Sequence, residues 1–378
     1  MRRSLSALLC LVVLISPSFC TTASAQLPAE EVGTAELPPP RDSWLMVRAF
    51  TDGNYIFDAE DGQMQGLVPH HLYTPALVTV PERGEIYHVD SFLTRRERGE
   101  RNDVLTVVDL KTLTTKAEID IPDKAAALPH RGHIALLGDD RHLVVYNLTP
   151  AQSVSVVDVI DREFDGEIAT PGCAVSLPVE QRAFLMICAD GALQLIELDA
   201  DGKELRRDRS APFFLPDQDP VFALNILTAD GWLLISHDGL AYRVAVEKGQ
   251  VSVSEPKVLL DAADHEQQWR PGGEQPVSVH RPSNRMYVLM HQGGVDTHAQ
   301  AGTEVWVYDL DSMRRVQRML LQAAAMRLLV SQQDEPRLYV LGVDDRLRIF
   351  DGRQLSLLRI IDQLGAWPGM LQLLARHD

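Results

Sequence analysis

Two cysteines, Cys173 and Cys188, are the residues of this chain whose type and spacing most clearly predict chemistry. They begin and end the segment CAVSLPVEQRAFLMIC, in a chain of 378 residues that has only four cysteines. If PVEQR holds the turn of a hairpin centred between Glu180 and Gln181, the two cysteines face each other across antiparallel strands. The spacing favours a structural disulfide, because reactive cysteine pairs favour C-x-x-C. Two buried free thiols are the alternative.

The strongest candidate for a metal site is the stretch HQGGVDTH, where His291, Asp296 and His298 share a turn-rich loop. Imidazole and carboxylate groups are ordinary zinc ligands, but nothing in this spacing fixes a geometry. We therefore favour a solvated loop and predict no metal site. The other paired histidines are equally unspecific: His70 with His71, and His130 with His133.

Motifs of several enzyme classes do not occur in the sequence. There is no G-x-S-x-G nucleophile elbow, no Walker A motif and no dinucleotide-binding glycine motif. We therefore predict no catalytic, cofactor-binding or metal-binding residue in this chain. Trp269, in WRPGG, is expected to pack in a constrained turn. The mixed-charge run from Arg95 to Arg101 predicts a salt-linked surface loop, with a contact for an acidic partner as the alternative.

The N-terminus has the three parts of a secretory signal peptide. Arg2 and Arg3 are basic, Leu5–Ile15 is an apolar run too short for a comfortable membrane span, and Ala23–Ala25 offers a small-residue cleavage site. We predict that residues 1–25 are removed and that the protein is exported, to the periplasm in a bacterium.

Removal of the signal peptide also removes Cys10 and Cys20, which leaves Cys173 and Cys188 as a pair in an oxidising compartment. Residues 26–41 are acidic and Pro-rich and predict an extended arm. The formal net charge of −17 disfavours nucleic acid and anionic lipid as partners. No later stretch approaches 18 consecutive apolar residues, so we expect no membrane partner either.

Residues 42–378 contain a repeated phrase, in which an apolar run is followed by an anchor residue, usually acidic, and then a turn. A second apolar strand accompanies most copies. The spacing between anchors, 39 to 64 residues, is close to the period of propeller blades, so we predict an all-β, seven-bladed β-propeller over residues 42–378. A β-sandwich is the alternative, and residues 313–327 could pass for helix, although they lie between predicted strands. The seven anchors are Asp58, Asp109, Asp158, Glu197, Ala245, Asp309 and Asp351.

Several stretches resemble the heavy subunit of the quinone-dependent amine dehydrogenases, a family that includes the methylamine and aromatic amine enzymes. The aromatic type is slightly favoured, and the resemblance covers nearly all of residues 42–378. The matching stretches are 94–109, 173–188, 189–203, 219–227, 269–292 and 304–312.

The resemblance implies a periplasmic seven-bladed propeller with one disulfide, and no catalytic centre of its own. It implies a partner, a small cysteine-rich light subunit that carries tryptophan tryptophylquinone, in a heterotetramer of two heavy and two light chains. The complex would oxidise a primary amine to aldehyde and ammonia and pass electrons to an azurin- or amicyanin-like blue copper protein. The alternative is a free-standing periplasmic propeller, acting as a lactonase-like hydrolase or a binding scaffold.

The resemblance also implies one site residue. The family's heavy chain lends a phenylalanine near its first blade to the substrate channel, and Phe50, in RAFTDGNYIFD, is the nearest candidate. Phe50 as an ordinary core residue is the alternative.

Overall fold

A computed structural model describes residues 36–375 except 51, 52, 72, 73, 75, 97, 127 and 225. The predicted signal peptide and most of the predicted arm, residues 1–35, lie outside the described residues. Residues 36 and 37 contact the first sheets, because Lys111 Nζ lies 2.7 Å from Glu36 Oε2 and Leu37 N donates to Lys111 O. In the part of the chain that is described, no helix is long and apolar enough to span a membrane.

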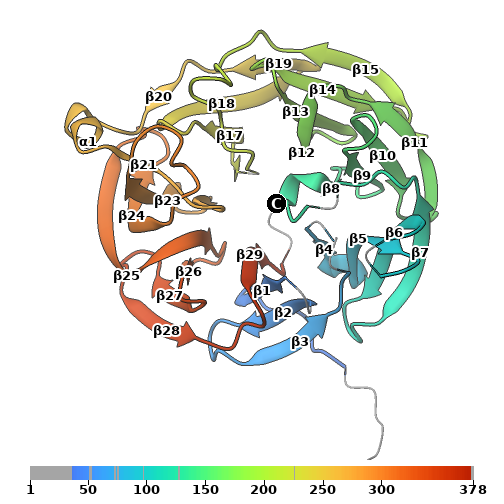
Figure 1. Ribbon diagram of the computed structural model, residues 1–378, viewed down its shortest axis with the longest axis horizontal. Coiled ribbons are helices and arrows are strands. Elements are labelled where there is room, and N and C mark those ends of the chain that lie inside the picture. The colour runs from blue at the N-terminus through green and yellow to red at the C-terminus, as the bar shows by residue number, and fades with distance from the viewer. Residues whose placement is uncertain are drawn as a thin grey trace, which may run out of the picture. The chain divides into compact units, whose positions relative to one another are not determined.

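The described residues form an all-β ring of sheets around a centre, as predicted (Figure 1). Five sheets have the size of one blade, and their strands in hydrogen-bonded order are as follows. They are β29 (Pro368–Leu373), β1 (Trp44–Ala49), β2 (Gly53–Asp58), β3 (Met64–Val68); β4 (Val78–Val80), β5 (Glu85–Leu93), β6 (Arg101–Asp109), β7 (Thr115–Ile121); β8 (Ile134–Leu136), β9 (His142–Asn147), β10 (Ser153–Asp158), β11 (Glu163–Ala169); β12 (Cys173–Val179), β13 (Ala183–Cys188), β14 (Leu193–Leu198), β15 (Glu204–Arg209); and β16 (Leu227–Thr228), β17 (Gly231–Ile235), β18 (Leu240–Glu247), β19 (Gln250–Val253), with β20 (Lys257–Val258) also paired to β18.

The sixth sheet has eight strands, and the described residues also form three short helices. Its strands are β21 (Trp269–Pro271), β22 (Val277–His280), β23 (Arg285–Gln292), β24 (Gly302–Asp309), β25 (Arg315–Val330), β26 (Arg337–Gly342), β27 (Leu347–Asp351) and β28 (Leu357–Ile361). The helices are η1 (Pro81–Arg83), η2 (Arg131–His133) and α1 (Ala262–Glu266). Helix α1 and strand β21 are formed by the insert that lengthens the interval between the fifth and sixth anchors.

Every copy of the repeated phrase forms a strand, and each pairs antiparallel with an apolar strand before it. The pairs are β1 with β2, β5 with β6, β9 with β10, β13 with β14, β17 with β18, β23 with β24 and β26 with β27.

The predicted count of seven separate blades is wrong. The described residues form five blade-sized sheets and one eight-stranded sheet, because β25 continues for 16 residues without a turn. Its first half pairs with β24 and its second half with β26, so the last two copies of the repeat share one sheet. Residues 313–327, which could pass for helix in the sequence, are mostly strand for the same reason. Their cross-strand contacts override local helix propensity.

The ring is closed by pairing the end of the chain with its beginning. In Figure 1 the red β29 lies beside the blue β1, and Leu371 is opposite Val47 in the ladder. The Gln275 side chain secures the inner edge of β29, since its amide donates to Leu371 O and its oxygen accepts from Leu371 N, both at 3.1 Å. Strands from near both ends of the described chain therefore share one blade-sized sheet, in which β29 lies nearest the centre of the ring (Figure 1).

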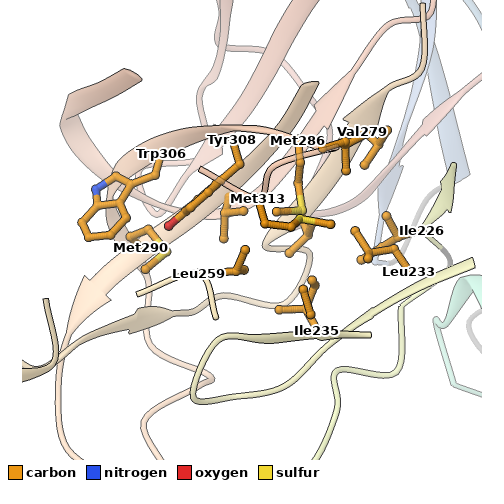
Figure 2. Close-up of a cluster of buried hydrophobic side chains, with 14 of the residues drawn as sticks. Ile226, Leu233, Ile235, Leu259, Val279, Met286, Met290, Trp306, Tyr308 and Met313 are labelled. Carbon is orange, nitrogen blue, oxygen red and sulfur yellow. The ribbon is translucent and has the colours of Figure 1, made fainter. Parts of the chain in front are cut away.

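Neighbouring sheets bury their apolar faces against each other. Figure 2 shows one such layer, in which Leu233 and Ile235 of β17 meet Met286 of β23 and Tyr308 of β24. Each of these four side chains is at most 1% exposed. Because each sheet needs a neighbour to cover both faces, the apolar runs of the repeat are stable only when the ring is complete.

The predicted disulfide is confirmed, with Cys173 opposite Cys188 and their Cα atoms 4.0 Å apart. The turn differs from the prediction, because three residues, 180–182, separate the paired Val179 and Ala183. That register alone would place Ala189 opposite Cys173. A β-bulge at Val175, whose φ is 64°, shifts the register by one residue and brings Cys188 into place.

Candidate functional site

A cavity of about 470 Å³ lies where four sheets converge; we call it the axial cavity. Its wall comes from the end of β1, the segment before β8, the segment before β16, the eight-stranded sheet and β29. The lining residues are Arg48, Phe50, Pro129, His130, Arg131, Ala223, Leu224, Glu274, Gln275, Val277, Arg327, Asp345, Trp367, Pro368, Gly369 and Met370.

The floor of the axial cavity is polar and contains more arginine than carboxylate. Arg48, on β1, is only 4% exposed and donates to Thr74 O at 2.9 Å. Burial lowers the pKa of Arg48 to about 10, so the side chain remains charged at neutral pH. Arg327, on β25, forms an ion pair with Glu274, and burial lowers its pKa as well. These groups can hold and orient a polar ligand or the backbone of a partner.

Helix η2 places two histidines beside the cavity. His130 caps this helix, because its Nδ1 accepts from Gly132 N at 3.1 Å. The His133 ring lies 4.8 Å from the His130 ring and 5.1 Å from Tyr146. Burial, and then the neighbouring His130, lower the pKa of His133 to about 4, so it is neutral at pH 7.

The mouth of the cavity carries two exposed aromatic residues, beside the exposed carboxylates of Glu274 and Asp345. Phe50 follows β1 and is 44% exposed, while Trp367 precedes β29 and is 69% exposed. Their ring centroids lie 6.0 Å apart. Gly365 allows the loop before β29 to approach this closely, since a Cβ at that position would lie 2.4 Å from Tyr55 Cε2.

Other exposed apolar residues lie on the same side of the ring. Since strands within a blade are antiparallel, the β1–β2, β5–β6 and β26–β27 turns leave the sheets on the same side as the connections between sheets; we call this side the cavity face. Besides Phe50 and Trp367, it carries Phe92, Leu128, Leu148, Leu215, Val295 and Val343, each at least 40% exposed. Apolar residues of other elements are exposed as well, among them Leu320 at 76% and Leu358 at 50%. What distinguishes the cavity face is the contact between the exposed rings of Phe50 and Trp367 at the cavity mouth.

The Arg95–Arg101 run forms the β5–β6 connection and also lies on the cavity face. Its described residues are mostly exposed. The predicted salt link is present at its end, where Arg101 Nε lies 2.6 Å from Asp103 Oδ1. The loop therefore adds cationic side chains to an apolar surface in an otherwise acidic protein.

The residues of the HQGGVDTH stretch do not come together as the candidate metal site considered from the sequence. His291 Nε2 bonds to Thr297 Oγ1 at 2.9 Å, and the His298 ring stacks on His237 with centroids 3.8 Å apart. Among the described residues, the cluster of possible metal ligands lies elsewhere and contains none of these residues. Trp269 packs as predicted, 6% exposed and 5.1 Å from the Trp306 ring.

Phe50, the phenylalanine predicted for the substrate channel, is among the residues that line the axial cavity, and its role in a channel stays a prediction. The sequence analysis did not name Trp367, Arg48 or Arg327. Arg48 had a usable signal, because it is the one charged residue within the apolar strand WLMVRA. Trp367 had a weaker one, since the flanking Gly365 and Pro368 predict a constrained turn but not what the turn faces.

A family model described as methylamine dehydrogenase heavy chain (MADH) matches residues 46–374. The chain belongs to the methylamine dehydrogenase heavy chain family. A curated methylamine dehydrogenase heavy chain from Paracoccus versutus is 29% identical over 86% of this chain and 76% of its own length. One from Methylophilus methylotrophus is 28% identical over 84% of this chain and 78% of its own length.

Solved structures of low sequence identity share the fold. A putative 6-phosphogluconolactonase from Bacteroides fragilis has a TM-score of 0.60 and 13% identity, covering 91% of this chain and 99% of that chain. A β-propeller domain from Myceliophteria thermophila has a TM-score of 0.54 and 10% identity, covering 82% of this chain and 93% of that chain. These likenesses concern the fold alone, so the first does not favour a lactonase activity.

Proposed function

We propose that this protein is the heavy, cofactor-free subunit of an amine dehydrogenase, and that its cavity face docks a small quinone-bearing light subunit. The observation that carries the proposal is the match to the heavy-chain family over residues 46–374. The axial cavity supports it, because its described lining residues include no serine, cysteine, lysine or tyrosine nucleophile. Such a wall suits binding and positioning.

In the proposed complex a primary amine and water yield an aldehyde, ammonia, two protons and two electrons. The tryptophan tryptophylquinone of the light subunit would accept the two electrons. This chain contributes the aromatic pair at the mouth of the cavity, where Phe50 and Trp367 would cover the entrance and exclude water from the amine's path. The arginines of the floor hold the polar part of the docked partner. Phe50 remains our candidate for the channel phenylalanine.

The finer parts of the proposal rest on the sequence. The pattern of residues 1–25 and the Cys173–Cys188 disulfide support a periplasmic location. The family resemblance leads us to expect two heavy and two light chains, an azurin- or amicyanin-like blue copper acceptor and a preference for aromatic amines. The curated relatives are methylamine enzymes, so a comparison of kcat/KM for methylamine and an aromatic amine decides the preference.

The test is reconstitution. The chain and its small subunit are co-expressed with the genes that mature the quinone, and amine-dependent reduction of a dye is measured for the chain alone, the small subunit alone and both together. We expect the two chains to co-purify and the highest turnover in the mixture. Turnover of amine or lactone by this chain alone, or an inactive mixture that contains mature quinone, would contradict the proposal.

A further inference from the structure

A second cluster of chemically competent side chains lies in the β8–β11 sheet, outside the axial cavity. His142 is the first residue of β9, Asp158 is the last residue of β10, and the two are opposite each other in the ladder. Asp165 lies on β11. One ligand atom from each of these residues lies within 4.8 Å of the other two.

A β-bulge aims Asp165 at this point. In the β10–β11 ladder Val156 pairs with Gly166 and Val157 with Phe164, which leaves Asp165 as the extra residue. In the adjacent sheet the corresponding extra residue is Lys116, which pairs with Glu85 at the first position of β5 at 2.6 Å. In the β8–β11 sheet the position of Lys116 is taken by Asp165, and the position of Glu85 by His142. A lysine–glutamate ion pair in one sheet thus corresponds to a carboxylate and an imidazole in the next.

The imidazole of His142 has a fixed orientation. Its Nδ1 lies 2.6 Å from Asp139 Oδ2, and the side chain is 1% exposed. A histidine that donates Nδ1–H to a carboxylate presents the lone pair of Nε2, the arrangement that orients metal-binding histidines. His142 Nε2 has no hydrogen-bond partner, and neither has Asp165 Oδ2.

These two unsatisfied atoms lie 3.8 Å apart. That separation is too long for an N–H···O hydrogen bond. It is within the distance that two ligands can span when each lies about 2.1 Å from one metal ion. A direct ion pair between a protonated His142 and Asp165 would bring the two atoms closer than 3.8 Å.

The charge around the cluster is negative. Asp139, Asp158, Asp161 and Asp165 face two cations, Arg141 and Lys203. Arg141 Nε lies 2.5 Å from Asp158 Oδ2, and Lys203 Nζ bonds to the carbonyl oxygen of Asp165, not to its carboxylate. A divalent cation would offset this excess of negative charge.

The next sheet covers the cluster. Gly202, in the β14–β15 turn, packs against the Asp165 carboxylate, since a Cβ there would lie 2.6 Å from Asp165 Oδ2. A groove of about 320 Å³ lies beside Asp165 and is lined in part by its neighbour Gly166, by Gly202 and by Lys203. His142, Asp158 and Asp165 do not line this groove, so the cluster is a buried site.

We propose that His142 Nε2, Asp158 and Asp165 form a zinc site that joins β9, β10 and β11, with water completing the coordination. One imidazole and two carboxylates suit Zn²⁺ better than Ca²⁺ or Mg²⁺, which take oxygen ligands. The site is separate from the axial cavity, and it does not depend on the proposed function.

The test uses the untagged chain, freed of metal with a chelator and then titrated with ZnCl₂ by calorimetry. We expect one equivalent of zinc and a raised Tm. Asp165→Asn and His142→Gln should each weaken binding at least tenfold. Asp139→Asn should weaken it about 10- to 100-fold, because it loosens the imidazole. Circular dichroism checks that each variant folds.

Two control variants distinguish the site from nonspecific binding. His298→Gln removes a histidine of the separate His237–His298 stack, and Asp120→Asn removes an exposed carboxylate of β7; both should bind zinc like the parent chain. Co²⁺ bound to the parent chain gives visible absorption bands that report nitrogen and oxygen ligands without any substitution. Zinc binding that survives Asp165→Asn and His142→Gln, absence of binding, or equal competition by Ca²⁺ would each overturn the proposal.

Discussion

Phe50 and Trp367 form one aromatic pair from opposite ends of the chain, at the mouth of the axial cavity. Phe50 N donates to Ala366 O at 3.1 Å, and the ring centroids of Phe50 and Trp367 lie 6.0 Å apart. The pair therefore depends on the closure of the ring between β1 and β29. Pairing of β29 with β1 therefore both closes the ring and completes the mouth of the axial cavity.

Phe50→Ala and Trp367→Ala should each weaken association with the light subunit. Exposed aromatic residues that become buried at the centre of an interface often contribute about 2 kcal/mol or more, which is about 30-fold in Kd. The measurement is the Kd of the reconstituted complex, by calorimetry or sedimentation. Leu205→Ala is the matched control, because Leu205 is 67% exposed on the outer strand β15. Equal effects of all three substitutions would remove Phe50 and Trp367 from the interface.

Reduction of the Cys173–Cys188 disulfide should destabilise the folded chain by roughly 3 kcal/mol, the chain-entropy value for a loop of about 15 residues. The double variant Cys173→Ala/Cys188→Ala should show a similar loss, since it removes the same constraint. Urea unfolding with and without reductant measures both. An unchanged unfolding midpoint under reducing conditions would show that the bond contributes little to stability.

Gln275→Ala should weaken ring closure. The substitution leaves Leu371 N–H and C=O without their side-chain partner at a buried position, which costs about 1–3 kcal/mol. Denaturant unfolding measures the loss, and hydrogen exchange at Leu371 should become faster. Gln354→Ala, on an exposed turn, is the control and should be neutral. An unchanged free energy of unfolding in Gln275→Ala would mean that pairing with β1 is enough to hold β29 in place.

His133 should make stability fall in acid. Its folded pKa is about 4, below the ordinary value of about 6.5, because it is buried and lies beside His130. Between these two pH values the unfolded chain binds more protons, so the free energy of unfolding falls as pH drops through this window, by up to about 3 kcal/mol.

The variant His133→Gln should therefore lose less stability than the parent chain between pH 7 and pH 4.5. Urea unfolding at both pH values provides the comparison, with His70→Gln as a control for a second histidine whose pKa burial lowers less. Parallel pH profiles of the parent chain and His133→Gln would assign the acid sensitivity to other groups.

The strands of this fold could be predicted because each apolar run ends at a turn residue and recurs at a blade-like period. The number of sheets could not, since nothing in residues 315–330 distinguishes a strand that ends from one that continues into the next sheet. The disulfide was predictable from spacing, but the β-bulge that sets its register was not. Val175 adopts a positive φ that β-branched residues rarely take, and the local sequence gives no signal for it.

The candidate sites likewise contain residues that could be predicted from the sequence and residues that could not. Phe50 was identified through a family resemblance, whereas Trp367 joins it only because the chain ends meet at β29. His142, Asp158 and Asp165 come from three strands, and a β-bulge directs the third side chain. Spacing along the sequence cannot indicate a cluster whose geometry depends on strand register.

Hydrogen exchange of the chain, alone and bound to the light subunit, tests most directly whether the partner docks on the cavity face. Protection should rise in the loops at 94–100, 343–346 and 362–367, and remain unchanged in the opposite turns at 138–141, 180–182 and 229–231. Protection confined to those opposite turns, or no protection of the loop that carries Trp367, would contradict the account.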